Sequence, residues 1–293
     1  MAAKPMTYAE TGVDIEANDR MVELIRHHMA RTRTQRVLGR HGDFAGCFRL
    51  DYNEKLFQRN YRDPVLVSCT DSVGSKVKLA VELNICNTVG RDAVAMCVND
   101  LIVKGAEPLF FLDYIGTHKL DPERMTEIVD GVADGCQLAG CALLGGETAE
   151  LKDLYAPGDF DLVGFSVGVC DRRKLVDRMR VEQGDVIFGL ASTGVHSNGY
   201  TLVREIVKQA NLDLRKPAKE VDAQRTLGEV LLTPTRIYAK SVVAVLNHYR
   251  VKRVVSAMAH ITGGGLVDNI GRVLPPDLDA RIDRKTWPIP PVF

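Results

Sequence analysis

The chain has 293 residues, enough for one large domain or two of ordinary size. Basic and acidic residues number 38 each and aromatic residues make up only 6%, which argues against a nucleic-acid partner. No apolar run reaches the roughly 18 residues of a membrane span, and the start lacks the apolar segment of a signal peptide. The seven cysteines form no CxxC pair and have no histidine at zinc spacing, which predicts free thiols in a reducing cytoplasm.

The first predicted elements are an amphipathic helix over residues 15–36 and a glycine-rich loop over residues 39–48, GRHGDFAGCF. Gly39, Gly42 and Gly46 would let backbone N–H groups approach a phosphate closely. The loop matches neither GxGxxG nor the Walker A pattern. An ordinary flexible turn is therefore an equal alternative.

A short apolar strand, residues 64–70, is predicted to deliver Asp71 to a turn before a helix over residues 77–83. A carboxylate followed by small hydroxyl and glycine residues at such a turn is typical of metal and phosphate sites. Lys76 would supply a nearby positive charge. The alternative is that Asp71 is a plain helix N-cap.

A nearly continuous apolar helix is predicted over residues 93–103, and only Asn99 and Asp100 interrupt it. Burying a carboxylate costs several kcal/mol unless a positive or donating group meets it. Either Asp100 is solvated on the flank of the helix, or the amide and the acid face a cation or phosphate. A buried strand is predicted to follow over residues 109–114.

The same arrangement recurs after the next helix, which is predicted over residues 121–139. A strand over residues 141–144 is predicted to end at Gly-Gly-Glu-Thr, which places Glu147 beside buried structure. If folding brings Asp71, Asp100 and Glu147 together, the three carboxylates would repel one another unless a hard cation such as Mg²⁺ neutralised them.

A glycine-containing strand over residues 160–170 closes the first half, and we place a domain boundary after residue 171. The predicted domains are residues 1–171 and residues 172–293. In the second, the pattern predicts strands over 186–190 and 251–259 and helices over 200–210 and 235–246. The fold class is α+β with mixed α/β layers, two domains and a cleft between them.

Two loops of the second domain are candidate anion sites. Residues 192–199, STGVHSNG, and residues 262–265, TGGG, each precede a predicted helix, and helix N-termini attract anions. His196 is either a functional histidine or a loop histidine satisfied by its neighbours.

Five motifs occur in a fixed order: TDSVGSK, MCVNDLIVKGAEPLFFLDY, GGETAE, HSNGY and HITGGG. With the lead-in YAETGVD, they resemble the aminoimidazole ribonucleotide synthetase family, the phosphoribosylformylglycinamidine cyclo-ligases, over nearly the whole chain. The resemblance implies a homodimer whose N-terminal sheets pair into a barrel, with a C-terminal α+β domain beside them. It also implies ATP-dependent closure of the imidazole ring in purine biosynthesis.

The resemblance implies ATP and Mg²⁺ as cofactors, with K⁺ a further candidate, and a small ribonucleotide as substrate. It assigns Asp71, Asp100 and Glu147 to Mg²⁺ and the nucleotide phosphates. Asn99 would orient Asp100 or a phosphate, and Lys76 would neutralise charge on the transferred phosphoryl group.

The glycine loop resembles the segment that closes over the triphosphate in this family. Substrate contacts are implied for six residues: His196, Ser197 and Asn198, with Thr262, Gly263 and Gly264 as a cradle for phosphate in the neighbouring motif. His196 is also the candidate for proton handling during ring closure, because an unperturbed histidine titrates near neutral pH.

The chain stops well short of the usual family length after residue 293. Two alternatives therefore stay open: a truncated, non-catalytic nucleotide-binding subunit of a dimer, or a related enzyme such as selenophosphate synthetase or thiamine monophosphate kinase. The HSNGY and HITGGG motifs favour the purine enzyme over those relatives.

Overall fold

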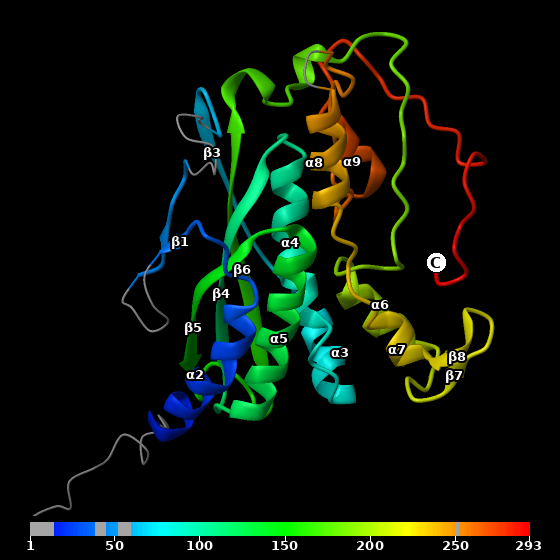
Figure 1. The fold of residues 1–293 in the computed structure, drawn as a ribbon. Helices are drawn as coiled ribbons and strands as arrows, with labels where there is room; N and C mark the ends of the chain where they lie inside the picture. The colour runs from blue at the N-terminus through cyan, green and yellow to red at the C-terminus, as the bar shows by residue number, and fades with distance from the viewer. Residues whose placement is uncertain (1–14, 39–44, 52–59, 250–251) are drawn as a thin grey trace, which may run out of the picture.

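A four-stranded sheet forms the centre of the first half of the chain (Figure 1). The computed structural model describes residues 15–38, 45–51, 60–249 and 252–293. The strand order is β3-β6-β4-β5, in which β4 and β5 are parallel and the other neighbours antiparallel. The strands are β3 (Pro64–Ser72), β4 (Glu107–Thr117), β5 (Ala142–Glu150) and β6 (Phe160–Asp171).

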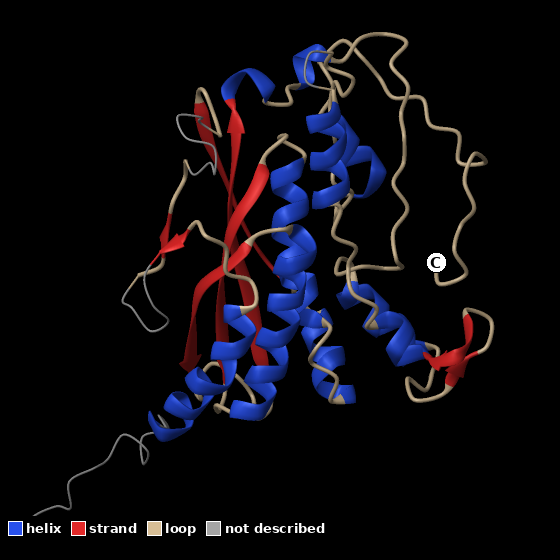
Figure 2. Ribbon diagram, in the orientation of Figure 1, coloured by secondary structure: helices blue, strands red, loops and turns tan. Residues whose placement is uncertain are grey.

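Helices cover one face of this sheet (Figure 2). They are α2 (Ile15–Ala30), α3 (Lys76–Leu83), α4 (Val89–Ile102) and α5 (Pro122–Ala139). Because β4 and β5 are parallel, a crossover must join them, and α5 is that crossover. The start of α5 is as predicted: the Asp121 side chain accepts a hydrogen bond from the Arg124 backbone N–H, and Pro122 is the first helical residue.

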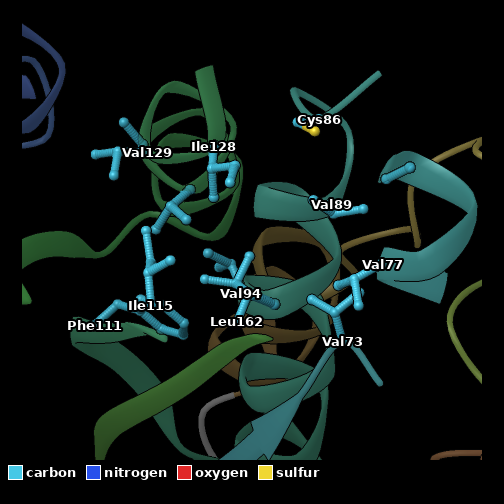
Figure 3. Close-up of a cluster of buried hydrophobic side chains, with 14 of the residues drawn as sticks. Val73, Val77, Cys86, Val89, Val94, Phe111, Ile115, Ile128, Val129 and Leu162 are labelled. Carbon is cyan, nitrogen blue, oxygen red and sulfur yellow. The ribbon is translucent and has the colours of Figure 1, made fainter. Parts of the chain in front are cut away.

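A continuous apolar core lies between the sheet and its helices (Figure 3). Val94 of α4, Ile128 of α5, Phe111 and Ile115 of β4 and Leu162 of β6 have no exposed surface. Burying a side chain of this size stabilises the fold by about 1.5–3 kcal/mol. The α4 helix is apolar on nearly every side because the sheet, α5 and the second half of the chain all pack against it.

The opposite face of the sheet carries no helix among the described residues. Side chains alternate along a strand, so Leu66 of β3 and Phe165 of β6 point to this face, where they are 61% and 40% exposed. A small sheet of β1 (Val37–Leu38) and β2 (Cys47–Phe48) lies beside it, with the Phe48 ring against the Phe110 ring. In one chain the sheet is therefore an open layer and not a closed barrel.

From residue 172 on, short helices alternate with long irregular segments (Figure 2). The elements are η1 (Arg172–Lys174), η2 (Arg178–Arg180), α6 (Tyr200–Gln209), β7 (Pro217–Ala218), β8 (Asp222–Thr226), α7 (Leu227–Leu231), α8 (Ala239–His248) and α9 (Gly265–Gly271). The predicted helices over residues 200–210 and after the HITGGG motif are confirmed. The third begins at Ala239, four residues later than predicted.

Two strands predicted in this region are wrong. Residues 186–190 pair with no strand, and Val186, Ile187 and Phe188 are 74%, 56% and 85% exposed. The described part of the other one, residues 252–259, also contains no strand. Apolar patterning forms a strand only where a neighbour satisfies the backbone hydrogen bonds, and no described segment does so here.

Boundaries in the first half also differ from the prediction: α2 ends at Ala30 instead of residue 36, and two further differences concern site residues. β5 does not end before Gly-Gly-Glu-Thr but continues to Glu150, so Glu147 lies within the strand. β3 continues through Asp71, and Ser75 stands at the N-cap position of α3, so the N-cap alternative for Asp71 is wrong.

The mixed α+β class is confirmed. No described helix combines the length and apolarity needed to span a bilayer.

Candidate functional site

Most of the predicted site residues gather where the last turns of α4 meet the end of β3 and three loops of the second half. We call these the His196 loop (residues 192–199), the Thr235 loop (residues 233–238) and the His260 loop (residues 260–265). Figure 1 shows α4 between the sheet and this second half. The site is therefore built from both halves of the chain.

Asp100 occupies the centre of this junction. Its Oδ1 lies 2.8 Å from Nδ1 of His260, and its Oδ2 accepts a hydrogen bond from the Cys69 thiol at 3.5 Å. The Asp100 side chain is 43% exposed and that of His260 only 11%. Burial opposes ionisation of Asp100, but the hydrogen bond and charge of His260 outweigh it, so the pKa of Asp100 lies below its usual value.

Asp71 lies near Asp100, but its pKa is shifted in the opposite direction, above the usual value. Burial raises the pKa of Asp71, and the charge of Asp100 raises it further, against a hydrogen bond from the Ser72 backbone N–H. Two carboxylates whose pKa values are moved apart by their surroundings are typical of functional sites. A cation between them would relieve the part of the shift in the pKa of Asp71 that comes from the charge of Asp100.

Lys76 has a different place from the one that the sequence predicted. Its side chain is fully buried, and Nζ lies 2.8 Å from Oδ2 of Asp92 in α4. Nζ also donates to the backbone carbonyls of His196 and Thr233, at 2.8 and 2.9 Å. An ammonium without exposed surface and with three partners cannot reach a transferred phosphoryl group, so that predicted role is wrong for this structure.

Asn99 also faces away from the acids. Its Nδ2 donates to the carbonyl of Arg236 at 2.9 Å, and its Oδ1 accepts from the backbone N–H of Tyr238 at 3.2 Å. The side chain is buried, with both ends of the amide satisfied. Asn99 thus binds the Thr235 loop to α4, and the prediction that it orients Asp100 or a phosphate is corrected.

His196 has left-handed backbone geometry, with φ 63°. Its Nε2 accepts hydrogen bonds from the backbone N–H groups of Thr193 at 3.0 Å and Arg236 at 3.4 Å. Burial, together with the nearby charges of Lys76, His260 and Arg236, lowers the pKa of His196 to about 4. The reason for assigning it proton handling, a pKa near neutrality, is therefore wrong.

Ser197 and Asn198 follow in the same loop and differ in accessibility. Ser197 is buried, and its hydroxyl donates to the Val73 carbonyl at 2.9 Å. Asn198 lies beside Met96 of α4, with Nδ2 3.8 Å from the sulfur. A Cβ placed on Gly263 would lie 3.8 Å from Oδ1 of Asn198, so this loop and the His260 loop are neighbours.

The remaining residues of the His260 loop lead into α9. The Thr262 hydroxyl hydrogen-bonds to Oδ1 of Asn269, and Nδ2 of Asn269 in turn donates to the Gly265 carbonyl. A Cβ on Gly264 would lie 2.8 Å from Cβ of Asp268, which explains glycine there. These contacts fix the shape of the loop beside Asp100.

Glu147 lies far from the other two acids. The register across the sheet joins Asp71 to Gly164, Asp113 and then Gly146, which precedes Glu147. Three strand spacings separate the ends of that row, about 14 Å. Within the part of the chain that the structure describes, no three His, Cys, Asp or Glu residues are placed to share a metal ion. The predicted three-acid cluster is therefore wrong for a single chain.

The glycine loop can be followed only in part. Gly39 and Gly42 lie outside the described residues. Gly46 packs against β5, where a Cβ would lie 2.4 Å from Cγ of Leu144, so only glycine fits. This end of the loop is on the Glu147 side of the sheet.

Models of two protein-family domains match the chain: AIR synthase related protein, N-terminal domain, over residues 53–170, and the C-terminal domain over residues 182–293. The phosphoribosylformylglycinamidine cyclo-ligase of Anaeromyxobacter sp. (strain Fw109-5) is 52% identical over 290 residues. The one of Geobacillus thermodenitrificans (strain NG80-2) is 51% identical over 287 residues. Each match covers 98% of this chain and 80% of the relative. The chain belongs to the phosphoribosylformylglycinamidine cyclo-ligase family.

Solved structures show the same fold at low sequence identity. HypE of E. coli has a TM-score of 0.56 at 14% identity, over 87% of this chain and 68% of that one. Thiamine-monophosphate kinase of Stenotrophomonas maltophilia K279a has a TM-score of 0.50 at 19% identity, over 76% and 64%. These structures support the fold alone. The family resemblance seen in the sequence is confirmed, and the identities favour the cyclo-ligases over the related enzymes.

Sequence reasoning missed several residues of this cyclo-ligase family site. His260 was noticed only as part of a motif, although it makes the hydrogen bond to Asp100. Asp92 received no role, yet it lies seven residues before Asn99, which places both on one face of α4. Two polar residues at that spacing in an apolar helix were the available signal. The partners of Asn99 in the Thr235 loop left no trace in the sequence.

Proposed function

We propose that this chain converts formylglycinamidine ribonucleotide to aminoimidazole ribonucleotide, with ATP giving ADP and phosphate. The identity of 51–52% to cyclo-ligases over 98% of the chain carries this proposal. In the reaction, the γ-phosphoryl group passes from ATP to the amide oxygen of the substrate, and ADP leaves. The ring nitrogen then attacks the activated carbon, and the C–O bond breaks as phosphate leaves with that oxygen.

Asp71 and Asp100 are the residues that we assign to Mg²⁺. Mg²⁺ in nucleotide sites takes one or two carboxylates, phosphate oxygens and water, so two acids suffice. The observation that fits a cation there is the closeness of the two carboxylates: burial raises the pKa of Asp71, and the charge of Asp100 raises it further. When bound, the ion would offset the negative charge of the phosphates. This assignment includes neither Glu147 nor K⁺. Lys76 is not part of it either, because its ammonium is buried against Asp92.

The substrate loops are assigned by their position around this acid pair. Asn198 and Gly263 lie close together, and His260, in the same loop as Gly263, makes a hydrogen bond to Asp100. We assign the ribonucleotide to Asn198 and the Gly263-Gly264 turn. Ser197 spends its hydroxyl on the Val73 carbonyl and so shapes the loop.

A homodimer is the second part of the proposal. The uncovered face of the sheet, with Leu66 and Phe165 exposed, is where two sheets would pair into a barrel.

We place the domain boundary after Asp171, where β6 ends. All seven cysteines are free, which supports a reducing cytoplasm as the location.

The activity is tested with the purified chain, ATP, Mg²⁺, K⁺ and formylglycinamidine ribonucleotide, by following aminoimidazole ribonucleotide through its diazo colour. We expect ATP-dependent colour from the wild-type chain. ATP binding without product or ADP formation would contradict the proposal and favour the non-catalytic subunit.

Asp100→Asn tests the site. We expect turnover to fall by at least about 10²-fold, because the variant loses one of the two carboxylates that we assign to the Mg²⁺ ion at the phosphates. Light scattering should show an unchanged oligomer. Asp153→Asn removes an exposed carboxylate outside the site and is the matched control. Equal activity of the two variants would rule out Asp100 as a phosphate or metal residue.

A further inference from the structure

Lys76 and Asp92 form an ion pair without any exposed surface. Nζ lies 2.8 Å from Oδ2, and both side chains are 0% exposed, unlike every other ion pair among the described residues. Burial of a pair is costly for both charges, and a pair of apolar side chains would pack at least as well. Stability of the core alone therefore does not explain the two charges.

The remaining hydrogen-bonding capacity of both charges goes to the second half of the chain. Lys76 donates to the His196 and Thr233 carbonyls, as described above. Oδ1 of Asp92 accepts from the Thr235 backbone N–H at 2.8 Å and from its hydroxyl at 2.5 Å. The pair thus binds the His196 loop and the Thr235 loop to α3 and α4 at once.

The two loops are also bound to each other through His196, whose Nε2 accepts from the Arg236 backbone N–H in the Thr235 loop. Its left-handed backbone turns its carbonyl to the buried ammonium while its ring meets the other loop. Two turns along α4 from Asp92, Asn99 holds Arg236 and Tyr238. The carbonyl that Lys76 binds is two residues from Asn198, the side chain that we assign to the ribonucleotide.

We propose that Lys76 and Asp92 are positioning residues that hold the His196 loop in place for the ribonucleotide substrate. The proposal rests on the proposed function, because it takes Asn198 as a substrate contact. It separates two halves of the site. Asp71 and Asp100 stand on β3 and α4, and Asp100 has its partner in the His260 loop, whereas the His196 loop depends on this buried pair. Loss of the pair should weaken binding of the ribonucleotide and leave binding of ATP unchanged.

Thr235→Val is the most conservative test. It removes the hydroxyl that donates a hydrogen bond to Asp92. It keeps the ion pair between Lys76 and Asp92 and the hydrogen bond from the Thr235 backbone N–H to Asp92. We expect the KM for formylglycinamidine ribonucleotide to rise about tenfold, with the KM for ATP within about twofold of the wild type. The control is Thr201→Val, which removes an exposed hydroxyl contact between the two halves, to Ser75, outside the loops.

A second variant keeps the test decisive. Lys76→Met with Asp92→Leu replaces both charges with apolar groups of similar size, and circular dichroism reports its folded fraction. We expect a larger rise in the KM for the ribonucleotide than in Thr235→Val. If the pair were merely structural, kcat would fall in proportion to the folded fraction and both KM values would stay unchanged. That result would overturn the proposal.

Amide hydrogen exchange provides a measurement that does not depend on activity. In Thr235→Val, peptides covering residues 192–199 and 233–238 should exchange faster than in the wild type and in Thr201→Val. If the wild-type chain makes no product, the proposed function fails, and exchange still decides whether the pair holds both loops. Exchange equal to that of the control would overturn the proposal.

Discussion

The sheet with its helices and the second half of the chain differ in how they bury apolar side chains. In the first, α4, α5 and the strands enclose Phe111 and Leu162 completely. In the second, Phe188 and Val267 are each 85% exposed. The first half has a core of its own, whereas the second half adds side chains to that core.

The contribution of the second half to the core is specific. Tyr200, Leu231, Leu232 and Ala239 are buried and belong to the same apolar cluster as α4 and the sheet. Buried polar contacts accompany them, from Asp92 to Thr235 and from Asn99 to the Thr235 loop. The second half therefore takes its position from α3 and α4, so the site geometry depends on the surface of the first half.

The largest expected difference between the two halves is in two phenylalanines. Phe111→Ala should destabilise the fold by about 3–5 kcal/mol, because it leaves a cavity under β4. Phe188→Ala should change the free energy of unfolding by less than about 0.5 kcal/mol. Urea unfolding of both variants provides the measurement. Equal destabilisation would mean that residues 186–190 are packed in solution, and it would contradict the difference in burial between the two halves.

A pair of glycines tests backbone packing on a smaller scale. A Cβ on Gly90 would lie 2.3 Å from the Ile128 carbonyl oxygen, whereas Gly189 has nothing within 4 Å. Gly90→Ala should destabilise the fold by about 1–3 kcal/mol despite the better helix propensity of alanine, because α4 and α5 must separate. Gly189→Ala should be nearly neutral. A stable Gly90→Ala variant would show that the two helices can move apart.

The smallest expected effect is the pH dependence from His196. Its pKa in the folded chain, about 4, lies below the value of about 6.5 for an unfolded histidine. The unfolded chain therefore binds the proton first, so the contribution of the neutral ring to stability is complete above pH 6.5 and is lost as the pH falls towards 4.

His196→Asn checks this sign. Asparagine tolerates the left-handed backbone and does not titrate in this range. The decrease in urea midpoint from pH 7 to pH 5 should be smaller in the variant than in the wild type. The same decrease in both proteins would show that the His196 ring is protonated without cost in the folded chain.

The sequence determined the family and most of the first half. Hydrophobic periodicity and caps located α5, β3, β4 and β6, because a segment that is buried against several neighbours carries a strong apolar pattern. Five ordered motifs identified the family that the comparisons confirm. The strands predicted over residues 186–190 and 251–259 failed because a strand is defined by its partner, which a local pattern does not contain.

Tertiary structure alone decided which polar residues meet. Lys76 and Asn99 were correctly singled out as unusual, but the backbone groups that they bind lie more than a hundred residues away in two loops. Asp71 and Asp100 came together because β3 lies beside α4, while Glu147 was separated from them by the strand order. Sequence shows that a buried charge needs a partner, and only the packed chain shows which partner it has.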